Sequence, residues 1–392
     1  MSALRLTPGQ RTAAAIVAAT ALNLPFGTLY AFSVVMKHLE ALLGVGRAET
    51  SFVFALATIT LTIGMNLAPR LYRGVPPPLL ALACGLCSGA GLFIASVAES
   101  FAAFSLGYGV LFGLGAGVGF ILVQQGVNQT VKGASGLANG YVVSLYPLGA
   151  MLGAPLFGWA ADSWGLRALL VGLGITVLAT CALAALLLRV AVIRMHDADA
   201  PADDGRDAQW PLFLRLGTVF FLAASAGLMV LSQAAGIVQA YGGAVALALG
   251  ATSFISGAVA LARLGGGWLV DHFRVPHVAV GAQLWSLAGA LILTFWPGPM
   301  VALPALAMIA MGYGITSGFT AAAIARYWPR NAFGRVASLL YVAWCVAAVG
   351  LPVLAGWLFD RTQGYASAVL IAAGVNVLGI LVAIGLPGRR RG

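Results

Sequence analysis

Twelve long apolar runs are the feature that most constrains how this chain can fold. They cover approximately residues 12–36, 50–69, 76–97, 101–125, 136–158, 166–189, 211–234, 244–270, 276–296, 300–325, 333–357 and 364–386. Each run has the roughly 20 residues that a helix needs to cross a bilayer. Backbone groups in lipid must satisfy their own hydrogen bonds, so we interpret the runs as membrane-spanning helices that leave almost no extramembrane domain.

The composition fits a membrane protein and excludes a disordered chain, a soluble enzyme and a disulfide-rich scaffold. Of the 392 residues, 61% are hydrophobic and only 8% are charged, and the mean hydropathy is +0.97. A soluble domain carries about 25% charged residues, so no water-soluble core could hide this apolar excess. The C-x-x-C pair Cys84 and Cys87 has no histidine nearby, and we interpret it as packing residues rather than a redox or metal site.

The distribution of positive charge predicts the orientation of the chain. With the N-terminus inside, sixteen of the 21 lysines and arginines fall on the cytoplasmic side. Lys37, Arg47, Arg167 and Arg361 fall outside, and Arg263 belongs to neither side. This is the positive-inside bias, so both termini are expected in the cytoplasm and the spans in the plasma (inner) membrane. The net charge of +10 is then a topology signal, and no nucleic-acid partner is expected.

The runs divide into two similar halves. A polar stretch at residues 195–207 holds five of the eleven acids and separates two sets of six runs. The fifth and eleventh runs end in matching motifs, Gly-x-Pro followed by Gly-Trp-x-x-Asp, at residues 153–162 and 350–360. We predict an N-terminal six-helix bundle over 1–190, a cytoplasmic linker over 191–210 and a C-terminal six-helix bundle over 211–392. Such repeats are typical of transporters with a midplane binding site between the halves.

The loop after the eighth run carries an acid and a base at a predicted cytoplasmic helix end. It reads Gly267-Trp-Leu-Val-Asp271-His-Phe-Arg274, which resembles the loop signature of the major facilitator superfamily. An acid and a base there can pair across neighbouring helix ends, so we assign Asp271 and Arg274 to a conformational latch. The matching stretch of the first half has Ala68 in place of the acid. A latch in that half is therefore either weak or built from other groups.

Three further motifs narrow the resemblance. They are Gly27-Thr-Leu-Tyr30-x-x-Ser33, Gly136-Leu-Ala-Asn-Gly140, and an arginine eight residues before Asp271. Together they resemble the oxalate:formate antiporter family, close to the monocarboxylate transporters, over nearly the whole chain. The resemblance implies an all-α membrane protein of twelve transmembrane helices in two pseudo-symmetric six-helix bundles. It also implies alternating access, as anion exchange or proton-coupled symport.

Arg263 lies inside a predicted span rather than at its end. It is eight residues from Asp271, about 12 Å along a helix, and an arginine near a helix centre costs about 2.5–3.5 kcal/mol on insertion scales. All eleven acids lie at helix ends or in loops, so no carboxylate is expected at its level. Either Arg263 is structural and bonds backbone carbonyls, or its planar fork binds the carboxylate of a substrate. Small neighbours, including Gly266 and Gly267, favour the second interpretation because they leave room for a ligand.

Five aromatic residues also fall in mid-span, where a tyrosine hydroxyl needs a hydrogen-bond partner. They are Tyr30, Phe120, Tyr146, Tyr313 and Tyr341. Bundle packing would explain each of them equally well. The family resemblance implies instead an aromatic cage around an anion bound by Arg263. It also adds Trp344 to the substrate-binding residues, at the place where the oxalate transporters carry a lysine, which makes seven with Arg263. A single cation suits a single carboxylate.

The sequence therefore predicts a secondary active transporter of small organic anions, with monocarboxylates of the lactate, pyruvate or formate type favoured over oxalate. A transporter of larger amphiphiles, such as drugs or siderophores, is the main alternative, and a transport-inactive receptor is a third. Nothing in the sequence indicates an enzyme, a cofactor or a metal site. We expect a monomer in the lipid bilayer that binds a small carboxylate, with protons as a candidate coupling ion.

Overall fold

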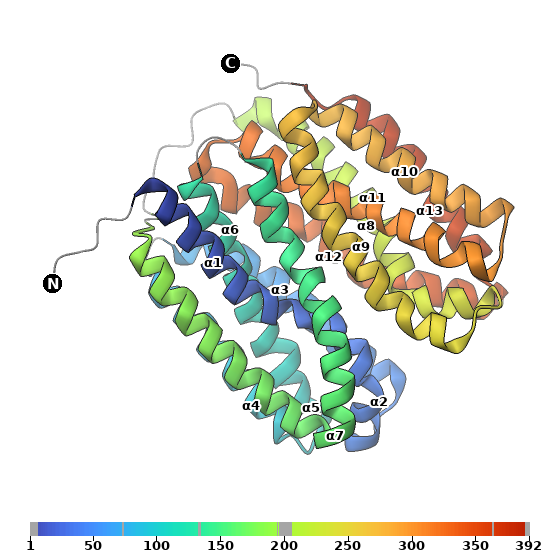
Figure 1. Ribbon diagram of the computed structural model, residues 1–392, viewed down its shortest axis with the longest axis horizontal. Helices are drawn as coiled ribbons and strands as arrows, with labels where there is room; N and C mark the ends of the chain where they lie inside the picture. Colours follow the sequence, from blue (N-terminus) through green and yellow to red (C-terminus); the bar gives the residue numbers. More distant parts are fainter. Residues whose placement is uncertain are drawn as a thin grey trace. The chain divides into compact units, whose positions relative to one another are not determined.

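The computed structural model describes residues 7–72, 74–131, 135–193, 195, 206–362 and 364–388. Within these ranges the chain is helical and forms no strand (Figure 1). Among the described residues, eleven helices are long and apolar enough to cross a membrane. One of them, α7 (Gly136–Val190), has 55 residues and includes Gly165, whose φ of 84° and ψ of 161° break the helical geometry. It therefore holds two of the twelve predicted spans, and the predicted all-α fold class is confirmed.

The elements of the first half follow the predicted runs. They are α1 (Pro8–Gly27), η1 (Thr28–Ala31), α2 (Phe32–Leu43), α3 (Arg47–Leu71), α4 (Pro77–Ser96), α5 (Phe101–Phe104), the π-helical η2 (Ser105–Phe112) and α6 (Gly113–Thr130). The segment Pro8–Leu43 makes one span from α1, η1 and α2. Glycines bring α3 and α6 together, since a Cβ on Gly113 or Gly117 would meet the backbone of Ala57 or Leu61. Small residues at such contacts are how helices approach closely in lipid.

The second half is built in the same way. Its elements are α8 (Arg206–Ala240), α9 (Val245–His272), α10 (Val275–Phe295), α11 (Pro299–Tyr327), η4 (Arg330–Ala332), α12 (Phe333–Thr362) and α13 (Ala366–Ile384). Glycines again mark the closest contact, because Gly314 and Gly318 of α11 lie against the backbone of Val259 and Arg263 in α9. The backbone of α9 at Val259 and Arg263 is therefore held close to α11.

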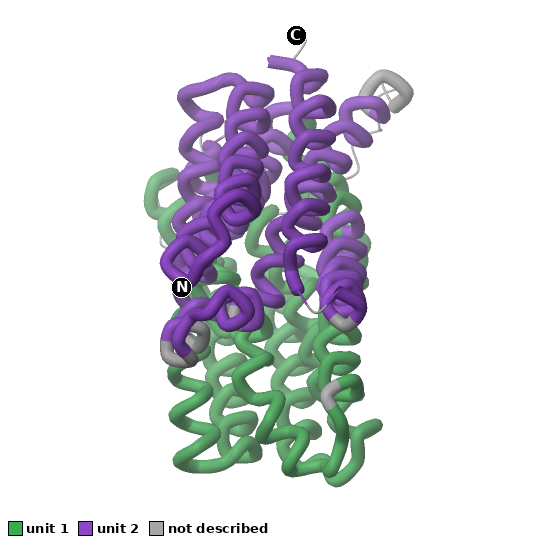
Figure 2. Tube along the Cα trace, turned by 90° about the vertical axis from the view of Figure 1, so that its right-hand side faces the viewer, with its two compact units in different colours: residues 1–133, 145–200, 328–341 green, residues 134–144, 201–327, 342–392 purple. Residues whose placement is uncertain are grey.

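The chain clusters into two compact units (Figure 2). Unit 1 comprises residues 1–133, 145–200 and 328–341, and unit 2 comprises 134–144, 201–327 and 342–392. Each unit thus includes the first turns of a helix whose remainder belongs to the other unit, α12 in unit 1 and α7 in unit 2. The predicted division at 190 and 211 follows the sequence repeat and stays a prediction. Most of the predicted linker, residues 194 and 196–205, lies outside the described residues.

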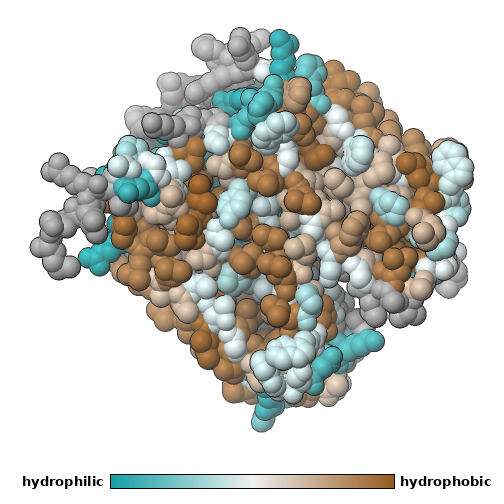
Figure 3. Space-filling view, viewed as in Figure 1, coloured by the Kyte–Doolittle hydropathy of each residue, from teal (hydrophilic) through white to brown (hydrophobic). Residues whose placement is uncertain are grey.

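Large apolar side chains lie on the surface as well as in the core. Hydrophobic residues are spread across the face drawn in Figure 3. Leu261 is 70% exposed, and Leu86 and Val353 are exposed to a similar degree. Exposed apolar patches of this extent are unusual for a monomer in water and are expected where lipid is the solvent. The chain is therefore a multi-pass membrane protein.

Candidate functional site

Arg263 lies at the centre of the membrane-spanning part of α9, Ser253–His272. It is buried, with only 4% of its surface exposed. Two glycines from other helices, Gly140 of α7 and Gly318 of α11, lie against its backbone carbonyl. A side chain at either position would collide with that carbonyl, so both glycines are needed for α7 and α11 to approach α9 at this level.

The expectation that Gly266 and Gly267 leave room for a ligand is wrong. Gly266 lies against the backbone of Ile315 in α11, and Gly267 lies against the backbone of Gly136 and Gly140 in α7. The space that a side chain would need at these positions is filled by neighbouring main chain. These glycines bring helices together and do not open a cavity.

The side chain of Arg263 joins a buried hydrogen-bond network inside unit 2. Its Nη1 donates to the carbonyl oxygen of Val143 at 2.8 Å, and its Nη2 donates to the hydroxyl oxygen of Tyr313 at 2.8 Å. The indole Nε1 of Trp344 donates to the same hydroxyl oxygen at 2.8 Å. Tyr313 and Trp344 are 1% and 2% exposed. Three of the seven predicted substrate-binding residues are thus brought together.

The ring of Tyr313 has two close neighbours besides Trp344. Gly227 of α8 lies against its Cβ and ring carbons, so the helix backbone packs directly on the aromatic ring. Cζ of Arg263 lies 5.3 Å from the ring centroid, within the range of a cation–π interaction. The position of the Tyr313 hydroxyl is therefore set by α8, α9 and α12 together.

The other four predicted residues form a cluster of rings inside unit 1. Phe120 lies edge-to-face against both Tyr146 and Tyr341, with ring centroids 5.0 Å and 5.2 Å apart. Tyr30 packs on Tyr146 with centroids 5.7 Å apart. The hydroxyl of Tyr146 donates to the carbonyl oxygen of Ala116 at 3.2 Å, so its proton already has an acceptor. That bond favours the packing interpretation of Tyr146.

Asp271 bonds the start of a helix. Its Oδ1 accepts a hydrogen bond from the backbone N–H of Gly136 at 2.8 Å, and its Oδ2 accepts one from Leu137 at 2.9 Å. A carboxylate at a helix N-terminus satisfies unpaired N–H groups and is stabilised by the helix dipole. Arg274 lies against Gly388 instead, and no ion pair joins it to Asp271 among the described residues. The predicted latch residue Asp271 therefore pairs with backbone, not with Arg274.

The first half, which lacks the acid, has neutral amides near the start of α12. The Nδ2 of Asn66 donates to the carbonyl oxygen of Ser338 at 3.0 Å. The amide of Gln125 donates to the carbonyl oxygen of Arg330 and accepts from the N–H of Gly334, both at 2.8 Å. The prediction from the sequence did not include Asn66. The feature that could have pointed to it is a side-chain amide close to Ala68, the position where the acid is absent. These contacts near the start of α12 are thus made by neutral amides.

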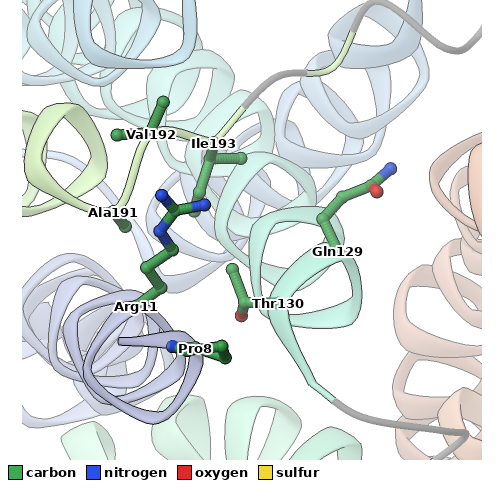
Figure 4. Close-up of a pocket in the computed structure, with 7 residues that line it drawn as sticks. All are labelled: Pro8, Arg11, Gln129, Thr130, Ala191, Val192 and Ile193. Carbon is green, nitrogen blue, oxygen red and sulfur yellow. The ribbon is translucent and has the colours of Figure 1, made fainter. Parts of the chain in front are cut away.

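A separate cavity of about 250 Å³ lies in unit 1 where α1 begins and α6 ends (Figure 4). It is lined by Pro8, Arg11, Gln129, Thr130, Ala191, Val192 and Ile193. In Figure 4 the side chain of Arg11 extends toward the segment 191–193. The lining includes none of the predicted substrate-binding residues, so we assign this cavity no part in substrate binding.

Comparison with known proteins finds one family over most of the chain. A family profile described as Major Facilitator Superfamily matches residues 16–350. The chain is also similar to a solved structure of the proton:xylose symporter XylE bound to 6-bromo-6-deoxy-D-glucose, with a TM-score of 0.77 and 98% of both chains covered. The sequence identity to that chain is 15%, so this likeness concerns the fold alone.

Three curated relatives are similar over most of their length. Monocarboxylate transporter 13 of Rattus norvegicus is 25% identical over 376 residues, covering 93% of this chain and 86% of the relative. Monocarboxylate transporter 11 of Mus musculus is 26% identical, covering 94% of this chain and 86% of the relative. An uncharacterized MFS-type transporter of Escherichia coli K12, YhjX, is 25% identical over 82% of each chain. The family resemblance predicted from the motifs is confirmed.

Proposed function

Because this chain belongs to the major facilitator superfamily of transporters, we propose that it carries small organic anions, above all monocarboxylates, across a membrane by alternating access. The observation that carries the proposal is the guanidinium of Arg263, buried at the centre of a span with its Nη2 on the Tyr313 hydroxyl. The names of the rat and mouse relatives, monocarboxylate transporters 13 and 11, support the same substrate class.

A carboxylate fits the chemistry of this site. Arginine stays charged at every physiological pH, and its planar fork matches the two oxygens of a carboxylate. Two of its partners, the Val143 carbonyl and the Tyr313 hydroxyl, are neutral oxygen atoms. Neutral oxygens leave the positive charge of the guanidinium uncompensated, whereas a carboxylate brings the opposite charge together with two parallel hydrogen bonds, so an anion would be its preferred partner.

Binding of the anion would also favour the movement between states. A guanidinium is costly to remove from water when no anion accompanies it, because desolvation of a single charge is not compensated. A bound carboxylate neutralises that charge, so closure around the loaded site is less unfavourable than closure around the empty one. The substrate would thereby bias the equilibrium between states through its differential affinity for the closed form.

The network favours one carboxylate over two. Trp344, the residue beside Tyr313 in the network, offers a neutral N–H rather than a second cation. The second charge of a dicarboxylate such as oxalate would lie in a low-dielectric environment without a matching cation, at a cost of several kcal/mol. We therefore favour lactate, pyruvate, formate or a larger monocarboxylate over a dianion.

A ligand screen tests the proposal. Purified wild-type protein is heated with each member of a panel of monocarboxylates, dicarboxylates and neutral amphiphiles, and the same panel is applied to Arg263→Ala. A ligand at 100 times its dissociation constant adds about 2.7 kcal/mol of stability. We expect at least one monocarboxylate to stabilise the wild type and none to stabilise Arg263→Ala. Arg167→Ala, which changes an exposed arginine at a helix end, is the matched control and should respond like the wild type.

Two other results would overturn the proposal. If no carboxylate stabilises the wild type while a drug-like amphiphile does, the alternative of an amphiphile transporter replaces it. If Arg263→Ala is stabilised as strongly as the wild type, the anion does not bind at Arg263. Arg263→Ala must elute as a monodisperse peak for the comparison to hold, and a variant that misfolds would assign Arg263 a structural role.

The coupling is proposed as anion exchange or proton-coupled symport. The sequence places no acid in mid-span, which favours exchange or a proton that moves with the substrate. Proteoliposomes separate the two schemes. Exchange is indicated if uptake of a labelled monocarboxylate requires an anion inside the vesicles and does not depend on a pH gradient. Symport is indicated if an inward proton gradient drives uptake into vesicles that contain no anion substrate.

The orientation is proposed from the sixteen-to-four distribution of lysines and arginines. Both termini and the linker at 195–207 should face the cytoplasm, in a plasma or inner membrane. Tags at these three places should react with an impermeant reagent only after the cells are opened. Labelling of the linker tag in intact cells would contradict this topology.

A further inference from the structure

The hydroxyl oxygen of Tyr313 accepts two hydrogen bonds, and the direction of both is certain. One donor is Nη2 of Arg263 and the other is Nε1 of Trp344, each at 2.8 Å. Neither a guanidinium nor an indole N–H has an acceptor lone pair, so the oxygen of Tyr313 must be the acceptor in both bonds. A phenolic oxygen with two donors in place has used its acceptor capacity.

The remaining hydrogen-bonding group of the Tyr313 side chain is its hydroxyl proton. Tyr313 is 1% exposed, and no residue that the structure describes accepts a hydrogen bond from its hydroxyl. A buried donor without an acceptor is destabilising, because the hydrogen bond it made to water in the unfolded chain is not replaced. The two incoming N–H groups also polarise the O–H bond and make it a stronger donor. The residue is thus prepared to donate to an acceptor that arrives beside Arg263.

We propose that Trp344 is a positioning residue that directs the hydroxyl proton of Tyr313 to the carboxylate of the substrate. Its indole N–H occupies one acceptor site of the hydroxyl oxygen, and Arg263 occupies the other. The hydroxyl cannot turn its proton toward either group, because both present only N–H. This inference rests on the proposed function and deepens it, since it gives the anion a neutral second donor next to the guanidinium.

The arrangement also sets specificity. A guanidinium and one directed hydroxyl together suit the oxygens of a single carboxylate and bring no second positive charge. Trp344 would therefore act through Tyr313, not by contact with the anion. The bicyclic ring of Trp344 contributes to packing, and its N–H contributes a hydrogen bond. Only the N–H affects the direction of the Tyr313 hydroxyl.

A double-mutant cycle tests this relation. Binding is measured by calorimetry for the wild type, Tyr313→Phe, Trp344→Phe and the double variant. The probe is whichever of lactate, pyruvate or formate stabilises the wild type most. We expect about tenfold weaker binding for each single variant. The double variant should bind no more weakly than Tyr313→Phe alone, because without the hydroxyl the indole N–H has nothing to direct.

A second variant guards against effects of ring size. Benzothienylalanine at position 344 keeps the bicyclic shape and replaces the N–H by sulfur, so it should weaken binding as Trp344→Phe does. Trp285→Phe changes a tryptophan of α10 that is 45% exposed and should leave affinity unchanged. Losses that multiply to about a hundredfold in the double variant, or full affinity with benzothienylalanine, would overturn the inference. Failure of the wild type to bind any of the three acids would instead overturn the proposed function.

Discussion

The same sequence pattern selects Tyr313 and Tyr146, but the structure gives their hydroxyl groups different hydrogen bonds. Both lie in mid-span, and both are 1% exposed. Tyr146 donates its proton to the carbonyl oxygen of Ala116, whereas the oxygen of Tyr313 accepts from Arg263 and Trp344. A tyrosine in a membrane span needs a partner, but only the neighbours decide whether its proton is used by the protein or is left for a ligand.

The regions around the two tyrosines differ in the same way. Around Tyr146 the contacts are between rings, with Phe120 edge-to-face against it and against Tyr341. Around Tyr313 the contacts are N–H groups on one oxygen, and one of those groups is a cation. The first region can shape and support a bundle, whereas the second has the charge and the donors that an anion requires. The comparison can be tested residue by residue.

The largest effect is expected at Arg263. Replacing a buried, hydrogen-bonded charge by alanine costs about 2–5 kcal/mol of binding, so Arg263→Ala should abolish measurable uptake of a monocarboxylate into proteoliposomes. Arg263→Lys keeps the charge but cannot bond Val143 and Tyr313 with one planar fork, so it should restore only a small part of the activity. Full activity in Arg263→Lys would show that a point charge is sufficient.

The next effect separates the two tyrosines directly. Tyr313→Phe should weaken carboxylate binding about tenfold, or about 1.4 kcal/mol, because it removes one hydrogen bond to the charged group. Tyr146→Phe should leave the dissociation constant unchanged, because its hydroxyl is already bonded to Ala116. Calorimetric titration of both variants with one monocarboxylate checks the pair. The reverse order of effects would place the binding role in the ring cluster.

A smaller effect is expected at the helix ends. Asp271→Ala removes the carboxylate from the start of α7, where its two oxygens accept from Gly136 and Leu137. The loss should be about 0.5–2 kcal/mol, as for other helix N-terminal caps. Arg274→Gln should change the melting temperature less, since Arg274 forms no ion pair with Asp271 in the described chain. Equal losses in the two variants would indicate an acid–base latch after all.

The smallest effect is expected in the ring cluster. Phe120→Leu keeps an apolar side chain but removes the edge-to-face contacts with Tyr146 and Tyr341. Such contacts contribute about 0.5–1.5 kcal/mol beyond buried area, so the melting temperature should fall slightly while carboxylate affinity stays the same. A large loss of affinity in Phe120→Leu would show that the rings contact the substrate.

Much of the fold could be predicted because each membrane-spanning helix is determined by the residues within it. The length and apolarity of each run decide that it spans a membrane, and an arginine in the middle of such a run is visible without a structure. The family followed from short motifs such as Gly267 to Arg274, and the family profile agrees with it.

The site could be predicted only in part, because it depends on contacts between residues that are far apart in the sequence. The Val143 carbonyl that accepts from Arg263 is a backbone group, and any residue type at 143 would offer the same oxygen. The role of Gly266 and Gly267 depends on which helix lies opposite, and the sequence alone suggested space where the structure has backbone. The sequence shows Trp344 in place of a lysine, but it does not show that the indole N–H donates to Tyr313.

The central claim is that the substrate's carboxylate binds Arg263, and a cycle between protein and ligand tests it most directly. The dissociation constants of a monocarboxylate and of its uncharged amide are measured for the wild type and for Arg263→Ala. If the carboxylate contacts the guanidinium, Arg263→Ala should lose the preference for the acid and bind acid and amide alike, while the affinity for the amide hardly changes. A variant that still prefers the acid by the wild-type factor would contradict the account.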